Sequence, residues 1–286
     1  MCLGNFTDKA AFFWKTVMHQ FPDAPEDIRY PARRRRTTPL GRTMADQGFI
    51  EALARGLHVL RCFSPDHACL GNQELARMTG LPKSTVSRIT YTLTSLGYLR
   101  YMPDSGLYCP DAGVLALGYG ALSAITTAQL AQPYMKELAR TTGAAVALGQ
   151  FDGESMIYVE AIHGSSALYL RLPVGYRLAM DSTMGRAYLA QLPVDQCEQL
   201  LRTLPGALPS ELAVKQARAD YQATGCCFGL GDWQQGIYAA AIAFESLKGE
   251  GTFVLSCGGP ASLFPEDTLR TQVAQAMRDI AHRLSL

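Results

Sequence analysis

Apolar positions between residues 49 and 109 predict three helices followed by a hairpin. Leucines and isoleucine recur at helical intervals and predict a helix near 49–62 with one apolar stripe: Ile50, Leu53, Leu57 and Leu60. A short helix near 73–79 follows, with Asn72 as its N-cap, and the break Gly80-Leu81-Pro82 ends it. A longer helix then runs from Lys83 to a stop at Gly97, and β-rich runs on either side of residues 102–106 predict a hairpin. This order is typical of a winged helix-turn-helix.

The outward face of the longer helix carries hydroxyl and cationic side chains and no carboxylate from Leu75 to Asp104. Hydroxyls and cations bond phosphates and base edges, whereas the DNA backbone would repel carboxylates. An ordinary solvated face is the alternative, but such faces usually mix Glu with Lys. The pattern therefore predicts a recognition helix for double-stranded DNA, with these contact residues on the helix and the wing: Lys83, Ser84, Thr85, Ser87, Arg88, Tyr91, Thr92 and Arg100.

Beyond residue 127 the pattern changes to hairpins and helices without regular β-α-β alternation. Strands are expected at 144–151, 155–162, 168–172, 237–244 and 252–257, and helices at 129–142, 184–192, 195–203, 211–223 and 267–284. Such an order predicts an α+β domain with a mainly antiparallel sheet. The apolar run Val114–Ala124 is expected to form a helix that joins this domain to the front of the chain.

Charge divides the chain in the same places. The formal net charge is +4 for residues 1–43, +1 for residues 44–110 and −4 for residues 111–286. This distribution suits a nucleic-acid-binding N-terminal part followed by a C-terminal part with a different function. We predict a disordered extension over 1–46; its run Arg33–Arg36 could instead act as a minor-groove arm, or translation could start at Met44 rather than Met1.

No apolar stretch approaches the ~20 residues of a membrane span. No secretory signal is evident at the N-terminus, so a cytoplasmic protein is expected.

The eight cysteines include no C-x-x-C pair and no spacing that suits zinc. Free thiols in a reducing cytosol are therefore expected, and no metal or cofactor. Cys226–Cys227 is the one cluster, so a cysteine-based redox-responsive regulator is kept as an alternative.

An enzyme in the back half is a second, weaker alternative. Side chains that could act as nucleophiles or bases are Cys226, Cys227, Cys257, Ser182, His163 and His282. The chain has no G-x-S-x-G, no H-E-x-x-H and no phosphate loop, so no catalytic residue is assigned.

Three segments together resemble the IclR-type bacterial transcriptional regulators. They are ALARGLHVLRCF (52–63), QELARMTGLPKSTVSRITYTLTSLGYL (73–99) and LPVGYRLAMDSTMGRAYLA (172–190). The resemblance covers roughly residues 49–284. It implies a DNA-binding domain over 47–111, a linker helix over 112–127 that contributes to dimer contacts, and a GAF-like effector-binding domain over 128–286. It also implies a sequence-specific regulator that assembles as a dimer or tetramer and whose operator binding responds to a small organic effector.

The same resemblance places the effector between the loop at Met180–Gly185 and the strands at 225–258. It implies these contacts: Met180, Thr183, Met184, Asp232, Trp233 and Ser256. Where many relatives carry polar anchors, this chain has Gly229-Leu230, Ala239 and Gly258, which favours a larger aromatic or carboxylic acid. Trp233 could equally be a surface aromatic, and Ser256 a strand residue that bonds its neighbours.

Overall fold

The computed structural model describes residues 49–164, 172–263 and 265–285. The predicted N-terminal extension, both candidate start sites and most of the strand expected at 168–172 lie outside these residues. The described residues form an N-terminal helix-turn-helix domain and a C-terminal α+β body.

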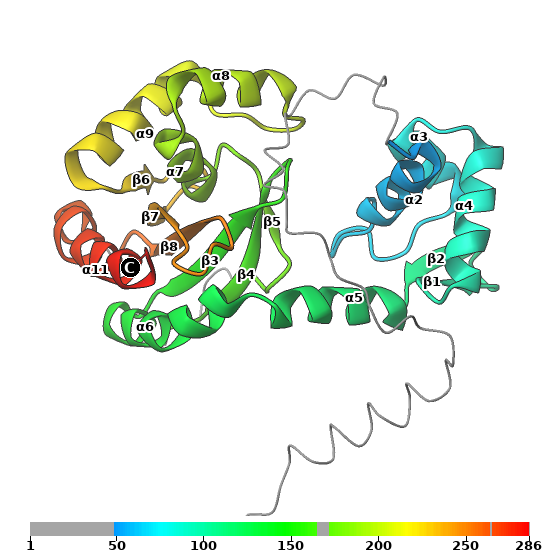
Figure 1. The fold of residues 1–286 in the computed structure, drawn as a ribbon, viewed down its shortest axis with the longest axis horizontal. Coiled ribbons are helices and arrows are strands. Elements are labelled where there is room, and N and C mark those ends of the chain that lie inside the picture. The colour runs from blue at the N-terminus through cyan, green and yellow to red at the C-terminus, as the bar shows by residue number, and fades with distance from the viewer. Residues whose placement is uncertain (1–48, 165–171, 264, 286) are drawn as a thin grey trace, which may run out of the picture. The chain divides into compact units, whose positions relative to one another are not determined.

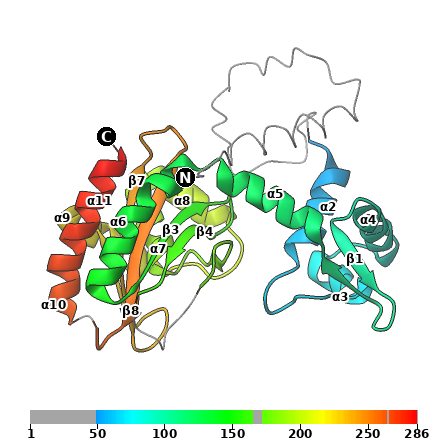
Figure 2. The same cartoon turned by 90° about the horizontal axis from the view of Figure 1, so that it is seen from below.

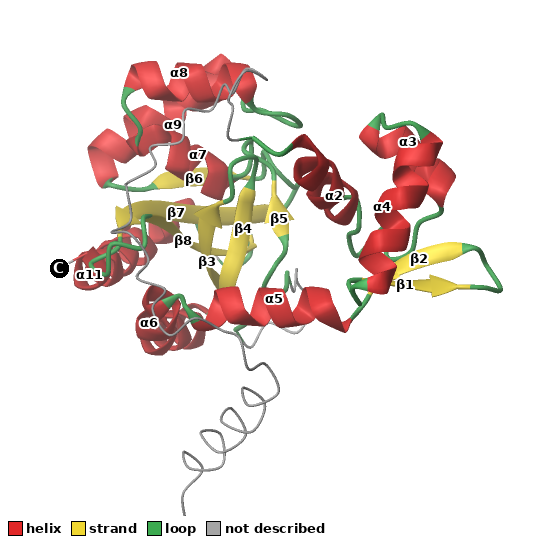
Figure 3. Cartoon of the chain, turned by 45° about the vertical axis from the view of Figure 1, so that its right-hand side comes forward, coloured by secondary structure: helices red, strands yellow, loops and turns green. Residues whose placement is uncertain are grey.

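The helix-turn-helix domain consists of three helices and a two-stranded hairpin (Figure 1). Its elements are α2 (Glu51–Arg61), α3 (Asn72–Thr79), α4 (Lys83–Ser95), β1 (Leu99–Met102) and β2 (Leu107–Pro110). Gly80 ends α3 in the left-handed conformation, at φ 68°, and this conformation allows the tight turn into α4. Figure 3 shows α3 and α4 as neighbours, with the antiparallel hairpin after α4. The predicted winged helix-turn-helix is therefore confirmed.

The helix predicted near 49–62 forms as α2, but most of its apolar stripe is exposed. Ile50, Leu53 and Leu57 are 66%, 59% and 53% exposed, and the core side of α2 is formed by Val59 with Cys62 just after it. An amphipathic stripe shows which face of a helix is apolar, but not whether the same chain covers that face. The role predicted for Asn72 is wrong, because Gly71 is the N-cap and Asn72 is the first residue of α3.

Two helices follow. α5 (Ala112–Ser123) is capped by Asp111, whose carboxylate accepts from the N–H of Ala112, and α6 (Thr126–Thr142) begins after a short break. The last residues of the predicted linker, 126 and 127, therefore belong to α6. None of the helices among the described residues is by itself long and apolar enough to cross a membrane, and α5 and α6 reach such a length only when taken together.

The body is a six-stranded antiparallel sheet in the order β5-β4-β3-β8-β7-β6. Its strands are β3 (Ala145–Phe151), β4 (Met156–Ile162), β5 (Arg177–Leu178), β6 (Cys227–Leu230), β7 (Ile237–Glu245) and β8 (Thr252–Pro260). β5 was not predicted, because two residues are too few to show a period. The predicted α+β class with an antiparallel sheet is confirmed.

Helices cover both faces of this sheet. One face packs against α6 and the C-terminal helix, which Figure 2 shows side by side. The other face packs against α7 (Thr183–Gln191), α8 (Val194–Thr203) and α9 (Glu211–Thr224). The single helix expected at 267–284 is instead α10 (Glu266–Thr268), a wide π-turn at Leu269–Val273, and α11 (Ala274–Ser285).

Candidate nucleic-acid interface and ligand cavity

The face of α4 that is turned away from the domain core is exposed and carries no acidic group. Val86 and Thr90 are fully buried on the inner side, and Tyr91 on the outer side is 74% exposed. The other predicted contacts on this helix are exposed, except for the half-buried Thr85: Lys83, Ser84, Ser87, Arg88 and Thr92. The unpaired N–H groups of the first helical turn add positive potential at the Lys83 end. This surface suits a polyanion.

Asn72 fixes the helix that precedes the turn against α4. Its side-chain amide donates to the hydroxyl of Ser87 over 3.2 Å, and its oxygen accepts from the hydroxyl of Thr90 over 3.2 Å. Ser87 therefore has a structural partner within the fold as well as an exposed position. Nothing in the local sequence indicated this role, because Asn72 is 15 residues from Ser87 and 18 residues from Thr90 along the chain.

The wing presents Arg100 to solvent from β1, opposite Cys109 of β2 in the strand register. The rings of Tyr101 and Tyr108 pack against each other across the same two strands, with centroids 5.0 Å apart. This aromatic pair stabilises the hairpin that carries Arg100.

The expectation of free thiols is wrong for two cysteines. Cys69 and Cys109 form a disulfide within the DNA-binding domain. The described cysteines without a disulfide are buried: Cys62, Cys197, Cys226, Cys227 and Cys257. Spacing along the chain could not reveal the pair, because 40 residues separate its members.

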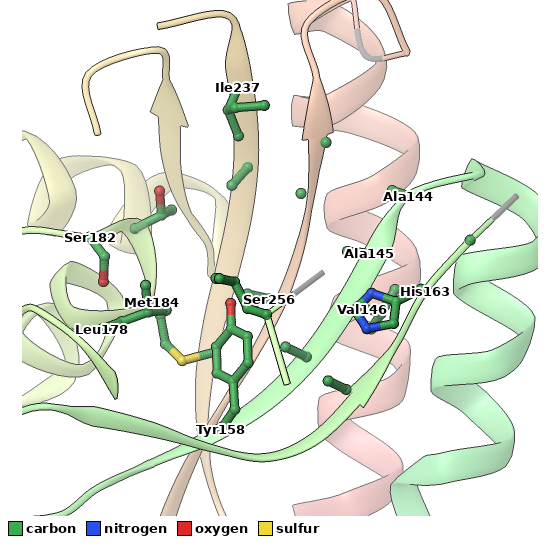
Figure 4. A pocket seen from close by; sticks show the side chains of 18 of the residues that line it. Ala144, Ala145, Val146, Tyr158, His163, Leu178, Ser182, Met184, Ile237 and Ser256 are labelled. Atoms are coloured by element: carbon green, nitrogen blue, oxygen red, sulfur yellow. The ribbon is translucent and has the colours of Figure 1, made fainter. Parts of the chain in front are cut away.

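A cavity of about 90 Å³ lies in the body, between the strands β3, β4, β7 and β8 and the start of α7. Small side chains leave this space open, among them Ala145, Ala147, Ala239 and Gly258. The volume is larger than one water needs. In Figure 4 the hydroxyl of Tyr158 points toward Ser256 inside the cavity. Such a cavity with few polar groups is typical of a site for a small organic ligand.

The structure brings four of the six predicted effector contacts to this cavity: Thr183, Met184, Trp233 and Ser256. Met180 and Asp232 do not line the cavity. Met180 is buried, and its backbone packs directly against Gly185 in the first turn of α7, where a Cβ would lie 2.5 Å from the Met180 Cα. Gly149 on β3 makes similar room for the side chain of Met184, since a Cβ there would lie 2.4 Å from the Met184 sulfur.

Tyr158 is a lining residue that sequence reasoning missed. It follows a register shift in the β3–β4 pairing, where Gly149 faces Tyr158. Burial raises the pKa of this phenol to about 12, although the Ser256 hydroxyl beside it acts in the opposite direction. Tyr158 therefore stays protonated and can donate a hydrogen bond to a ligand.

The N-terminus of α7 opens onto the cavity. The hydroxyl of Ser182 caps the helix by accepting from the N–H of Gly185 over 3.2 Å. The remaining N–H groups of the first turn, at Thr183 and Met184, have no acceptor within the helix. Together with the helix dipole they can receive an anionic oxygen.

Arg186 is a second residue that sequence reasoning missed. It is only 6% exposed, and its Nη1 pairs with the carboxylate of Asp232 at 2.5 Å, while Nε and Nη2 have no hydrogen-bond partner among the residues that the structure describes. A Cβ at Gly229 would lie 2.2 Å from the hydroxyl of Thr183 and 3.2 Å from Nη2 of Arg186. The absence of a side chain at Gly229 therefore lets the Thr183 hydroxyl and the Arg186 guanidinium pack against the backbone of β6. The predicted ligand contact Asp232 thus pairs with this arginine.

The adjacent cysteines do not form a reactive pair. Cys226 packs in the core under α6 and α11, and Cys227 in the core under α7 and α9. Burial raises the pKa of the Cys226 thiol to about 11, and burial also raises that of Cys227. The structure therefore gives the redox hypothesis at these two positions no support.

The residues considered for catalysis do not assemble into a site. His163 and Ser182 line the cavity, but Cys257 is buried in the core under α6 and α11, and His282 is exposed on that last helix. Burial raises the pKa of the Cys257 thiol to about 12, so it is a poor nucleophile. Across the described ranges, no group of His, Cys, Asp or Glu is placed to hold a metal ion.

Comparison with known sequence families agrees with both halves of the structure. The profile of the IclR helix-turn-helix domain matches residues 52–103, and that of the bacterial transcriptional regulator IclR C-terminal domain matches residues 119–286. The chain belongs to the IclR family. IclR proteins are DNA-binding transcriptional regulators, and the relatives found for this chain are regulators rather than enzymes.

Individual IclR-family proteins match along most of the chain. The HTH-type transcriptional regulator TsaQ1/TsaQ2 of Comamonas testosteroni is 29% identical over 241 residues, 82% of this chain and 86% of its own. The crystal structure of an IclR family transcriptional regulator from Brucella abortus shares 38% identity, with a TM-score of 0.78 over 87% of this chain and 97% of its own. An IclR homolog from Microbacterium hydrocarbonoxydans, solved in complex with 4-hydroxybenzoate, shares the fold at 21% identity and a TM-score of 0.64, over 82% and 97% of the two chains.

Proposed function

We propose that this IclR-family protein binds a pseudo-palindromic operator as a dimer or tetramer and that a small aromatic or carboxylic acid in the cavity changes its operator affinity. The exposed, carboxylate-free face of α4 is the observation that carries the DNA-binding part. A protein that binds the chromosome acts in the cytoplasm.

Within this proposal, α4 lies in the major groove and Arg100 follows the backbone from the wing. Arg88 is placed one turn into α4, where a guanidinium can reach the edge of a guanine. Lys83 and the hydroxyl residues near the start of the helix contact phosphates. Two copies of α4 reach successive major grooves about 34 Å apart, or a longer spacing.

Self-association is supported by α5, which contains no charged residue. Its large side chains are exposed in the single chain, with Leu115 and Tyr119 each more than 70% accessible. An uncharged helix with leucine and tyrosine on its surface is typical of a protein interface. We propose that a second copy of the chain covers this surface, and Leu117→Glu should shift the protein to monomer in analytical ultracentrifugation.

The ligand proposal rests on the lining of the cavity. Its surface is mostly apolar, Trp233 and Tyr158 are placed to pack on an aromatic ring, and the α7 N-terminus is placed to receive a carboxylate. The buried guanidinium of Arg186 adds positive potential behind Thr183. The 4-hydroxybenzoate of the Microbacterium homolog is a ligand of this class. Such a ligand acts only through different affinity for DNA-competent and DNA-incompetent states.

DNA recognition is tested with a duplex selected from random sequence by the full-length protein. Arg88→Ala should lower the discrimination between selected and mismatched duplexes by about 5- to 150-fold and leave the far-UV circular dichroism unchanged. Arg77→Ala is the matched control, because Arg77 is an exposed arginine on α3 that pairs with Glu74. Equal discrimination by the Arg88→Ala variant and the wild type would contradict the role of α4.

Ligand binding is tested by thermal shift with a panel of benzoates and short aliphatic acids. A specific ligand raises the melting temperature by mass action. Ala239→Leu fills the cavity from β7 and should abolish the shift while DNA binding persists. The proposal fails if no acid of the panel stabilises the wild type, or if the filled variant responds equally.

A further inference from the structure

The disulfide between Cys69 and Cys109 joins the segment before α3 to the wing. Next to it, Leu70 and Tyr108 exchange two backbone hydrogen bonds of 2.9 Å, which add a one-residue bridge to the outer edge of β2. Cys69 and Cys109 are the next opposed pair, with Cα atoms 4.4 Å apart. That separation is normal for a pair of antiparallel residues without mutual hydrogen bonds. The two thiols are therefore brought together by backbone pairing and do not require the bond to meet.

The disulfide lies between the two parts of the domain that carry the predicted DNA contacts. Cys69 stands three residues before α3, whose Asn72 holds α4. Cys109 stands opposite Arg100 in the wing register. When the bond is intact, the wing is covalently fixed to the segment that leads into the helix-turn-helix. When the bond is open, a single backbone bridge remains on that edge of β2.

Exposure makes Cys69 the entry point for reversible chemistry at this pair. Cys69 is exposed, whereas Cys109 is buried beside it in the folded domain, and Cys62, the third described cysteine there, is also buried. Burial raises the pKa of the Cys62 thiol and keeps it unreactive. In a compartment that keeps most thiols reduced, protein disulfides are usually transient and catalytic or redox-sensing.

We propose that Cys69 and Cys109 form a reversible thiol–disulfide site on the DNA-binding domain, and that the disulfide form binds operator DNA more tightly because it holds the wing in place. This inference rests on the proposed DNA-binding function. It assigns the redox response to Cys69 and Cys109, of which Cys69 is exposed, instead of to the buried pair Cys226 and Cys227.

The chemistry requires a peroxide as oxidant and a small thiol as reductant. The Cys69 thiolate attacks hydrogen peroxide, which gives a sulfenic acid and releases hydroxide; the Cys109 thiolate then attacks this sulfur and displaces the second hydroxide, and protonation turns both into water. In the reverse direction, one thiol opens the bond at Cys69 as a mixed disulfide and releases Cys109. A second thiol then frees Cys69 and leaves as the oxidised small disulfide.

The test uses the full-length protein after treatment with hydrogen peroxide or with dithiothreitol. Because Cys109 is buried in the folded domain, each sample is alkylated with N-ethylmaleimide in denaturant, and peptide mass spectrometry then reports whether Cys69 and Cys109 were free. Fluorescence anisotropy with the duplex selected by the oxidised protein reports affinity. We expect both cysteines to be protected from alkylation only after oxidation, and the Kd to rise about fivefold or more on reduction.

Two variants identify the source of the effect. A Cys69→Ser, Cys109→Ser double variant should bind with the reduced-state affinity under both treatments, and Cys62→Ala should respond like the wild type. The inference is overturned if both cysteines are alkylated after peroxide, if oxidised and reduced wild type bind equally, or if the double variant still responds. Absence of DNA binding in both states would refute the proposed function and this inference together. Equal binding in both states would refute this inference alone.

Discussion

Replacing Glu250 with Gln tests how α6 is held on the sheet of the body. Glu250 lies in the turn between β7 and β8, and its two carboxylate oxygens accept from the backbone N–H groups of Thr126 and Thr127 over 2.8 and 2.9 Å. These groups belong to the first turn of α6, for which α6 itself supplies no side-chain cap. The turn therefore serves as a distant N-cap for this helix. Because β8 also carries Ser256, the same contact links the cavity wall to the start of α6.

The size of the effect follows from what the substitution removes. Gln keeps one acceptor oxygen, so one of the two N–H groups loses its partner, and the negative charge at the helix N-terminus disappears. Loss of an N-cap contact and of a charge–dipole interaction together costs about 1–2 kcal/mol of unfolding free energy. For a domain of this size, we expect the melting temperature at pH 7 to fall by about 3–6 °C in differential scanning calorimetry.

The dependence on pH tests the electrostatic part. Burial acts to raise the pKa of Glu250, but the hydrogen bonds from Thr127 and Thr126 outweigh it and hold the pKa below its usual value. A lowered pKa in the folded state stabilises the protein above the pKa of the unfolded glutamate, about 4.3, and this contribution is lost as the pH falls through the folded-state value. The difference between wild type and variant should therefore be constant between about pH 6 and 8 and shrink toward pH 3.

Glu198→Gln is the matched control, since Glu198 is exposed on α8 and its contact with Arg202 spans 3.6 Å. This variant should melt within about 1 °C of the wild type, because exposed ion pairs contribute little. The reasoning is refuted if the Glu250→Gln variant also melts within 1 °C of the wild type at pH 7. A difference that persists unchanged at pH 3 would refute the charge-based part alone.

Three further predictions concern the DNA surface, the sheet and the buried arginine near the cavity. Lys83→Ala should reduce the slope of log affinity against log salt by about 0.9 in anisotropy titrations, as loss of one phosphate contact requires; an unchanged slope would exclude that contact. Gly149→Ala should lower the unfolding free energy in urea by about 1–3 kcal/mol, because its Cβ meets the Met184 sulfur. Gly56→Ala on α2 is the control and should not destabilise the protein, because no described atom lies within 4 Å of the added Cβ. Arg186→Met should weaken binding of an aromatic acid about tenfold or more in calorimetry with little change in melting temperature, and unchanged affinity would remove Arg186 from ligand recognition.

Local patterns were sufficient for the elements and the fold class. Apolar periodicity predicted α3, α4 and the wing with boundaries close to those observed, because a helix or hairpin is specified by neighbours a few residues apart. The face of α4 that is rich in hydroxyl groups and lacks carboxylates could also be predicted from the sequence, since helical geometry alone decides which side chains share a face. In the body, the order of hairpins and helices was enough to predict an antiparallel α+β domain.

Tertiary structure alone decided which partners these elements meet. The stripe on α2 is apolar in the sequence but uncovered in the single chain, because periodicity identifies a face and not its partner. Folding brings together segments that are far apart in the chain. Such contacts bury Arg186 and form the bond between Cys69 and Cys109. The cavity exists because small residues of four strands meet beside the start of α7. Which distant segments come close together depends on how the whole chain packs. Local patterns of apolar and polar residues therefore do not predict it.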